Sequence, residues 1–197
     1  MSPKIFFDRI TSGIGLILLL PVLLLIALII KIKMPDGPVI FKQKRVGLHG
    51  RLFFIYKFRT MIVQHDSNPV SIAGESRITP LGAFLRKYKL DELPELWNVL
   101  KGDMSFVGPR PDVPQYADIL KDEERTILGI LPGITGPASI KYSNEEEILS
   151  KVEDPHLYYE KIIFPDKVKI NHEYYANHSF TGDLIIILKT IFHVKDA

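Results

Sequence analysis

Adjacent carboxylates at Asp91 and Glu92 are the residues of this sequence whose types and spacing best suit chemistry on phosphate groups. A carboxylate pair can hold a divalent cation, and a single carboxylate can act as a nucleophile. Further along the same stretch, Arg110 stands in a Gly-Pro-Arg-Pro sequence. Its two prolines restrict the backbone, so the guanidinium could hold a phosphate in a fixed orientation. The stretch therefore indicates a site for phosphate chemistry.

Each member of this set also has a structural interpretation. Aspartate is a favoured N-cap, so Asp91 could begin a helix, with Glu92 as a first-turn acid that the helix dipole stabilises. The cap and the chemistry are compatible, because a helix N-terminus keeps a carboxylate ionised and fixed. Arg110 could equally be a buried arginine that donates to backbone carbonyls.

Further candidate phosphate ligands lie on either side of this stretch. A predicted strand over residues 52–61 places Lys57 and Arg59 on one face, as a solvated edge or as an anion contact. Thr135 stands between two glycines and could donate to a phosphate or cap a turn. The histidines show no metal-ligand spacing such as HExxH, which argues against a zinc site.

A run of seventeen residues without charge, 14–30, indicates contact with a membrane. As a straight helix it would be about 25 Å long, short of the roughly 30 Å hydrocarbon core. Pro21, near its middle, removes an amide donor and clashes with a preceding carbonyl. Basic residues flank the run on both sides, and positive charge marks cytoplasmic flanks. These features alone leave two alternatives open, a kinked transmembrane helix and a Pro-broken re-entrant helix.

Composition narrows the class of partner. The 197 residues include no cysteine, so disulfides and thiolate metal sites are excluded. The net charge is +2, yet residues 1–60 carry ten basic residues against two acidic ones. This basic portion surrounds the apolar run, which favours anionic membrane lipids over nucleic acid as the partner.

The remaining pattern predicts an α+β fold, mainly helical, with a small β-hairpin formed by residues 39–44 and 52–61. Residues 65–76 are polar and predict a loop, and residues 131–137 predict a rigid turn. Pro109 and Pro111 exclude helix around Arg110. Helices are expected over residues 79–86, 91–100, 144–152, 154–164 and 183–194. The last of these has a broad apolar face, which either packs in the core or lies on the membrane surface.

An ordered set of motifs in this chain resembles the bacterial sugar transferase family, in its small monotopic form of polyprenol-phosphate phosphoglycosyl transferases. The set covers roughly residues 5–136 and includes the Pro-broken apolar run with Phe7-Asp8-Arg9 before it. The other matching stretches are VIFKQKRVG, IYKFRTM, Leu81-Gly82 with Leu85-Arg86, LDELPELWNVLKGDMSFVGPRP and PGITG. Single matches of this kind mean little, but the ordered set is specific.

The resemblance implies a reaction in which Asp91 attacks the β-phosphate of a UDP-sugar. UMP leaves, and the phosphate of a polyprenol then attacks the phosphosugar–aspartyl intermediate. The resemblance further implies Mg²⁺ as the cofactor, with Asp91 and Glu92 as the metal site. Arg86 and Arg110 match family positions expected to steady phosphate or the backbone of the site, and Lys57 and Arg59 come from another family motif.

The resemblance also implies two regions: a re-entrant anchor over residues 1–34 and a catalytic domain over residues 35–197. The anchor would enter and leave on the cytoplasmic face of the bacterial inner membrane. UDP-sugar, polyprenyl phosphate and membrane lipids are the expected partners, without nucleic acid, and a homo-oligomer is compatible with the sequence. Residues 137–175 depart from the family pattern, which leaves the sugar open. A glycosyltransferase releasing UDP and a non-catalytic membrane scaffold remain as alternatives.

Overall fold

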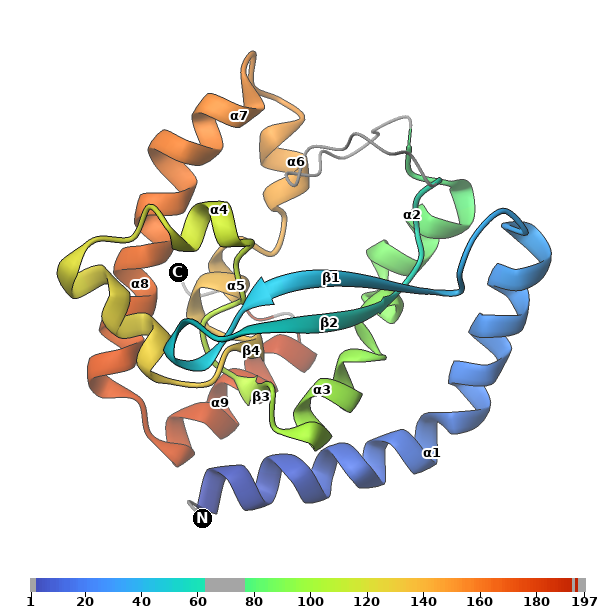
Figure 1. The fold of residues 1–197 in the computed structure, drawn as a ribbon, viewed down its shortest axis with the longest axis horizontal. Helices are drawn as coiled ribbons and strands as arrows, with labels where there is room; N and C mark the ends of the chain where they lie inside the picture. Colours follow the sequence, from blue (N-terminus) through green and yellow to red (C-terminus); the bar gives the residue numbers. More distant parts are fainter. Residues whose placement is uncertain (1–2, 63–76, 193, 195–197) are drawn as a thin grey trace.

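The computed structural model describes residues 3–62, 77–192 and 194, which form a mixed helical and sheet structure (Figure 1). The predicted α+β class is confirmed. The predicted loop over residues 65–76 lies outside the described residues. In chain order the elements are α1 (Pro3–Lys33), β1 (Ile40–Val46), η1 (Leu48–Gly50), β2 (Leu52–Phe58), α2 (Pro80–Lys87), η2 (Leu90–Glu92), α3 (Glu95–Lys101), β3 (Ser105–Val107), α4 (Pro114–Ala117), η3 (Asp122–Gly129), β4 (Gly133–Thr135), α5 (Pro137–Lys141), α6 (Glu145–Leu149), α7 (Pro155–Tyr158), η4 (Tyr159–Ile163), α8 (Phe164–Asn177) and α9 (Phe180–Ile191).

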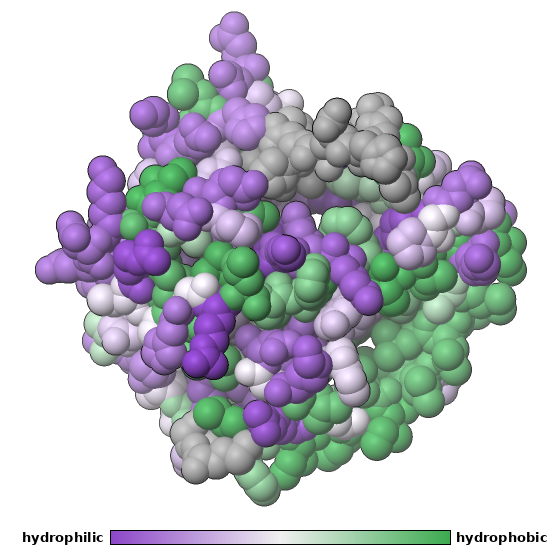
Figure 2. Space-filling view, in the orientation of Figure 1, coloured by the Kyte–Doolittle hydropathy of each residue, from purple (hydrophilic) through white to green (hydrophobic). Residues whose placement is uncertain are grey.

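Helix α1 contains the apolar run and continues through Pro21. Its most apolar window of 18 residues has a mean hydropathy of 3.1, so the helix is long and apolar enough to cross a membrane. Most of its large hydrophobic side chains are exposed, and they form a continuous apolar surface (Figure 2). The ribbon bends along its length and passes around one side of the molecule (Figure 1).

Both ends of α1 pack against the same body. Near its start, Asp8 accepts a hydrogen bond from the Ser105 hydroxyl at 2.7 Å, and Lys4 forms an ion pair with Asp183 of α9. Lys4 also donates to the Val107 carbonyl at 3.0 Å, while the Tyr174 hydroxyl donates to Asp183 at 2.6 Å. We call these five side chains the α1 staple: Lys4, Asp8, Ser105, Tyr174 and Asp183. Near its other end, Ile26 and Ile30 pack with Phe58 and Leu85.

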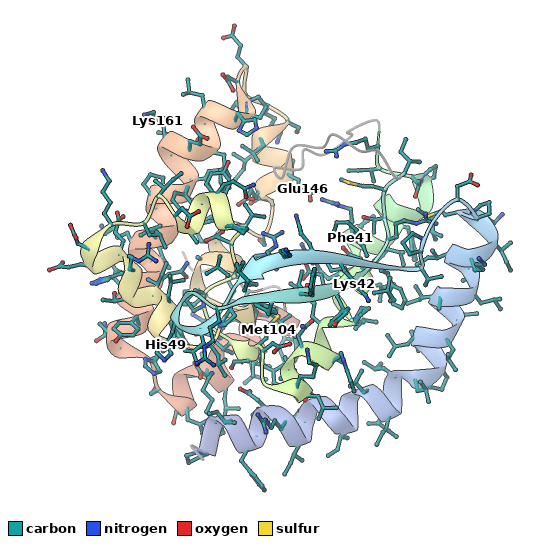
Figure 3. The ribbon with its side chains drawn as sticks, in the orientation of Figure 1. Phe41, Lys42, His49, Met104, Glu146 and Lys161 are labelled. Carbon is teal, nitrogen blue, oxygen red and sulfur yellow. The ribbon has the colours of Figure 1, made fainter. Side chains whose placement is uncertain are left out.

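The predicted hairpin is confirmed, with β1 and β2 antiparallel and Lys42 opposite Tyr56. The turn η1 places His49 and Gly50 at positive φ. A buried amide fixes the hairpin to α3, because Asn98 accepts from the Tyr56 amide at 3.1 Å and donates to the Phe54 carbonyl at 2.7 Å. Met104 lies beside the hairpin and α3 and packs in a cluster with Ile55 and Val99 (Figure 3).

Helix α2 begins and ends as its sequence predicts, with Thr79 as N-cap accepting from the Gly82 amide and Pro80 in the first turn. It lies so close to the segment that follows β2 that a Cβ on Gly82 would meet the Thr60 carbonyl oxygen at 1.9 Å. Gly102 ends α3 in the left-handed conformation, close to the predicted helix end at residue 100.

The prediction of Asp91 as a helix N-cap is wrong. Asp91 lies inside the 3₁₀ turn η2, and α3 begins only after Pro94. Lys89, at a positive φ of 55°, separates this turn from α2. Pro94 has no amide hydrogen, and the preceding amides of Glu92 and Leu93 donate to carbonyls three residues earlier, which is the 3₁₀ pattern.

A second small sheet corrects the prediction of a turn over residues 131–137. There β4 pairs in parallel with β3, with Ser105 opposite Gly133 and Val107 opposite Thr135. Glycine allows this approach, because a Cβ on Gly133 would lie 2.1 Å from the Gly108 amide nitrogen. The proline-flanked segment around Arg110 is non-helical, as predicted.

The C-terminal part is helical. The predicted helices over residues 144–152 and 154–164 correspond to α6 and to α7 with η4, but α8 extends to Asn177 and was missed beyond Phe164. Its apolar residues Phe164 and Val168 join Tyr116, Leu149 and Tyr159 in the largest buried cluster. Helix α9 keeps an apolar face exposed at Ile185, Leu188 and Ile191, so this face is not core.

Candidate functional site

An open cleft of about 1810 Å³ lies between the hairpin, α2 and η2 on one side and α5, α6 and α8 on the other. Asp91, Glu92 and Lys57 contribute to one wall, together with Arg110. On the other wall, Glu146 comes from α6, and its position is marked in Figure 3. The walls combine carboxylates, cations and apolar side chains such as Leu19 of α1.

Asp91 is a buried carboxylate at this wall, 7% exposed. Its Oδ1 atom has no hydrogen-bond partner among the described residues. Burial raises the pKa of the Asp91 carboxyl, the charge of Glu92 raises it further, and Lys57, Arg86 and Lys89 act in the opposite direction. Asp91 is therefore a carboxylate whose hydrogen bonding is incomplete, in a site where cations favour its ionised form.

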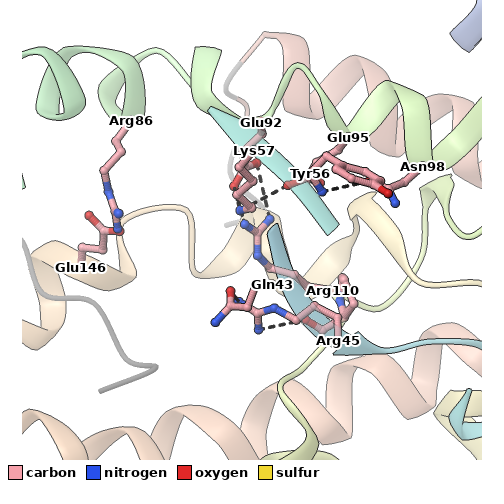
Figure 4. A network of polar contacts seen from close by, with 11 residues as sticks. Gln43, Arg45, Tyr56, Lys57, Arg86, Glu92, Glu95, Asn98, Arg110 and Glu146 are labelled. Carbon is pink, nitrogen blue, oxygen red and sulfur yellow. Dashed lines mark hydrogen bonds and ion pairs between the residues drawn. The ribbon is translucent and has the colours of Figure 1, made fainter. Parts of the chain in front are cut away.

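Glu92 gathers two cations on a single oxygen (Figure 4). Its Oε1 accepts from Lys57 Nζ at 2.9 Å and also from Arg110 Nη2, whereas Oε2 has a contact of 3.5 Å with Arg110 Nη1. Burial acts to raise the pKa of Glu92, but the charges of Arg110 and Lys57 outweigh it and hold the pKa well below its usual range. Glu92 is thus ionised, and Oε2 is its less occupied oxygen.

The placement of Arg110 decides between its two interpretations. Its guanidinium donates to the Glu92 carboxylate and is 39% exposed, at the cleft. No described backbone carbonyl has a hydrogen bond from the Arg110 side chain that would make it a backbone brace. Arg110 therefore presents fixed positive charge to the cleft, which suits an anionic ligand.

Other predicted phosphate ligands lie apart from this cluster. Arg86 forms an ion pair with Glu146 across the cleft (Figure 4). The Arg59 guanidinium is buried and donates to the carbonyls of Met34 and Asp36, so it braces the end of α1. Thr135 shares a hydrogen bond of 2.7 Å with Thr190 of α9, and both line the cleft.

Glu95 was missed by the sequence reasoning. It is fully buried, and its Oε1 lies 3.2 Å from Lys57 Nζ. Its spacing offered a signal, because residues three and four apart share a helix face, and Glu95 follows Glu92 and Asp91 at these intervals. A glutamate on that face could have been grouped with the carboxylate pair.

Buried polar atoms that lack a hydrogen-bond partner gather around the cleft. Within the described chain they belong to Arg45, Arg59, Asp91, Glu95, Glu145 and Asn171, of which Glu95 and Glu145 each form an ion pair, with Lys57 and Lys167. All of these residues except Glu95 line the cleft, and Glu95 contacts the cleft residue Lys57. Arg45 and Asn171 were also missed, and lone residues of these types carry no signal in a sequence. Incomplete polar groups mark a surface that a polar ligand can complete.

Two carboxylates of the cleft, Asp91 and Glu92, could contribute ligands to Mg²⁺, but they could not complete its coordination alone. Across residues 3–62 and 77–192, no three residues of the types His, Cys, Asp and Glu group so as to hold a metal. Mg²⁺ is, however, commonly bound by one or two carboxylates, with phosphates and water completing its coordination. Asp91 Oδ1 and Glu92 Oε2 are the two oxygens with room for such a role.

The fold and the cleft define a mixed α+β protein with a long apolar N-terminal helix and a cleft lined by carboxylates and cations. A model of the family described as bacterial sugar transferase matches residues 1–197. The uncharacterized sugar transferase EpsL of Bacillus subtilis (strain 168) is 38% identical over 192 residues, covering 97% of this chain and 86% of that protein. The chain therefore belongs to the bacterial sugar transferase family.

Two longer relatives carry names that state an activity. The UDP-glucose:undecaprenyl-phosphate glucose-1-phosphate transferase of Escherichia coli (strain K12) is 37% identical over 194 residues, covering 94% of this chain and 38% of that protein. The UDP-N-acetylgalactosamine-undecaprenyl-phosphate N-acetylgalactosaminephosphotransferase of Aeromonas hydrophila is 35% identical over 191 residues, covering 93% and 41%. The chain spans about two fifths of the length of these two relatives.

Proposed function

We propose that this chain transfers a phosphosugar from a UDP-sugar to a polyprenyl phosphate, such as undecaprenyl phosphate, and releases UMP. The names of the two longer relatives state this type of transfer. The observation that carries the proposal is Asp91, a buried carboxylate with an unpartnered oxygen at the wall of an open, cation-lined cleft. The product, a polyprenyl-diphosphate sugar, would be the first membrane-bound intermediate of glycan or polysaccharide assembly.

In the first step, Asp91 attacks the β-phosphorus of the UDP-sugar. A bond forms between the carboxylate oxygen and phosphorus, and the bond from phosphorus to the bridging oxygen breaks, so UMP leaves with that oxygen. Asp91 needs no general base, because its reactive form is the carboxylate itself. Its fixed position in η2 supplies the alignment that an in-line displacement requires.

In the second step, a phosphate oxygen of the polyprenyl phosphate attacks the same phosphorus. The new phosphorus–oxygen bond completes the diphosphate, and the bond to Asp91 breaks, which restores the carboxylate. Both steps bring anions together, so the fixed charges of Lys57 and Arg110 would stabilise the negative charge at phosphorus. Mg²⁺ bound through Asp91 and Glu92 would supply further neutralisation of phosphate charge.

The geometry of α1 supports a monotopic anchor on the cytoplasmic face of the bacterial inner membrane. Ser105 and Asp183 hold the start of α1, while Phe58 and Leu85 pack against its end. A straight helix of this length would be about 46 Å long and would place its ends on opposite faces of a bilayer. Because both ends contact one body, we propose that residues 1–34 enter and leave on one side, with residues 35–197 as the catalytic domain.

Identification of the released nucleotide tests the reaction type. Full-length protein in detergent is supplied with undecaprenyl phosphate and a panel of UDP-sugars, and the products are separated by chromatography. We expect UMP. Release of UDP would instead show an ordinary glycosyltransferase, and no turnover with any UDP-sugar would favour a non-catalytic scaffold.

Intact-mass analysis tests the covalent intermediate. The wild-type chain, incubated with the accepted UDP-sugar without polyprenyl phosphate, should gain the mass of one phosphosugar. The Asp91→Asn variant should gain none. The Asp183→Asn variant is the matched control, because it removes another buried carboxylate and should still form the adduct. An adduct on Asp91→Asn would remove Asp91 from the role of nucleophile.

Topology has a separate test that uses the absence of native cysteines. Exposed Arg9 and Lys33 flank the apolar run, and each is replaced by cysteine in turn. A membrane-impermeant maleimide should label both variants only when the cytoplasmic side of vesicles is accessible. Labelling from opposite sides would restore the transmembrane alternative.

A further inference from the structure

We propose that Glu95 is a positioning residue for the reaction: it holds Lys57 at the cleft wall, ready to bind the diphosphate of the nucleotide sugar. The proposal rests on the proposed function for the identity of that ligand. Glu95 does not line the cleft, so it would act through Lys57 and not on the substrate itself.

The contact geometry singles out this pair. Glu95 lies in the first turn of α3 and has no exposed surface. Among the described residues, its carboxylate is within ion-pair distance of Lys57 Nζ, at 3.2 Å, and neither of its oxygens has a hydrogen bond of good geometry. A buried carboxylate needs a compensating charge, and Lys57 is the cation in contact with it.

Lys57 is shared between two carboxylates, of which Glu92 lines the cleft and Glu95 is fully buried. Its ammonium lies 2.9 Å from Glu92 Oε1 and 3.2 Å from Glu95 Oε1 (Figure 4). Glu92 also binds Arg110 and lines the cleft, where a divalent cation or a phosphate group can change its contacts. Glu95 has no such exposure. When Glu92 is engaged by a ligand, Glu95 is therefore the partner that keeps Lys57 in place.

The charge of Glu95 matters beyond its shape. Lysine is a compact charge on a flexible stem, so a fixed counterion decides where it points. A glutamine at position 95 would keep the shape but would leave the whole Lys57 charge to Glu92. The substitution would also remove one of the three carboxylate charges that Lys57 and Arg110 compensate at this wall. Both Lys57 and the metal-binding carboxylates would then be less available to a Mg²⁺–diphosphate ligand.

A double-mutant cycle tests whether Glu95 acts through Lys57. The probe is UDP with Mg²⁺, and its binding to the full-length chain in detergent is measured by calorimetry for Glu95→Gln, Lys57→Met and the double variant. We expect each single variant to weaken UDP binding by roughly tenfold, the lower end of the loss that follows removal of a hydrogen bond to a charged group. If the residues act as one unit, the double variant should match Lys57→Met to within about twofold. Unchanged affinity in Glu95→Gln, or a double loss equal to the product of the single losses, would overturn the proposal.

Thermal unfolding gives an independent readout. In Lys57→Met the Glu95 carboxylate is buried without its cation, so the melting temperature should fall. Adding Glu95→Gln removes that uncompensated charge and should raise the melting temperature by about 5 °C or more above that of Lys57→Met alone. A double variant that melts at or below the Lys57→Met temperature would show that Glu95 does not depend on Lys57.

Asp183→Asn is the matched control for a general loss of stability. Asp183 is a buried carboxylate paired with a lysine, but it lies outside the cleft. This variant should melt at a lower temperature and keep the wild-type affinity for UDP. A weakened affinity would mean that destabilisation alone explains the Glu95 effect, against the proposal. The proposed function is tested separately, by the phosphosugar adduct on Asp91. If no adduct forms, the proposed function fails, but the coupling between Lys57 and Glu95 can still be measured in UDP binding.

Discussion

The α1 staple and the cluster around Asp91 both bury charged side chains, and they differ in how those charges are paired. The cluster consists of Asp91, Glu92, Glu95, Lys57 and Arg110. In the staple, Asp183 has Lys4 and Tyr174 as partners, and Asp8 has the Ser105 hydroxyl. No staple atom belongs to the buried, unpartnered polar atoms of the described chain. In the cluster, Asp91 Oδ1 does, and neither Glu95 oxygen has a hydrogen bond of good geometry, although Lys57 Nζ lies 3.2 Å from Glu95 Oε1.

This difference separates a structural network from a site. A buried polar group without a partner lowers stability, so a folded chain retains one mainly where a ligand completes it. The staple is complete and joins α1 to the body, as expected of a structural contact. The cluster is incomplete and faces the cleft, as expected of a binding surface. Loss of the Asp91 carboxylate and loss of the Asp183 carboxylate should therefore have opposite effects on stability.

The largest effect is expected for Asp91→Asn. Loss of a nucleophile should reduce UMP release by at least about 10³-fold. Burial and Glu92 raise the pKa of Asp91, so the folded state disfavours the ionised carboxylate. At pH values above the ordinary pKa of an aspartate, this charge therefore lowers the free energy of unfolding. The melting temperature at neutral pH should therefore stay equal or rise. A clear fall in melting temperature would contradict the assignment of the cluster as an incomplete site.

Asp183→Asn should show the reverse pattern. It removes the carboxylate that pairs with Lys4 and accepts from Tyr174, and it should lower the free energy of unfolding by roughly 2 kcal/mol. UMP release at low temperature should change little. Denaturant titration followed by circular dichroism measures the first quantity. A loss of activity at a temperature where the variant is folded would contradict the division between the two regions.

Arg110→Lys should give an intermediate effect on activity. Lysine keeps the charge beside Glu92 but loses the planar fork that reaches both carboxylate oxygens. We expect kcat/KM for the UDP-sugar to fall about tenfold or more. Steady-state kinetics check this, with Lys161→Arg as a control on the exposed surface. Wild-type kinetics for Arg110→Lys would show that only the positive charge of Arg110 matters, and not the geometry of its guanidinium.

The smallest effect is expected outside both regions. Lys151 pairs with Glu147 on the surface of the molecule, and both side chains are mostly exposed. Lys151→Ala should change the free energy of unfolding by less than about 0.5 kcal/mol and should leave activity unchanged. A larger effect would contradict the expectation that exposed ion pairs of this fold contribute little to its stability.

Local signals predicted most of the elements. Thr79 with Pro80 marked the start of α2, Gly102 marked the end of α3, and alternation predicted the hairpin. Elements that depend on distant partners were missed or misread. Residues 133–135 form a strand because β3 lies beside them. The cap interpretation of Asp91 failed for a local reason, because α3 begins only after Pro94 and Asp91 lies in the 3₁₀ turn before it.

The sequence by itself determined the chemistry that is available: a carboxylate pair, an arginine between prolines, an apolar run with basic flanks and a family membership. Residue types and short spacings carry this information because they act locally. The tertiary structure decided which charges meet. It joined Asp8 to Ser105 across 97 positions and brought Arg86 to Glu146 across 60, away from the cluster. It also placed Glu95 behind Lys57, since such contacts depend on how the hairpin packs on α3 and not on any local pattern.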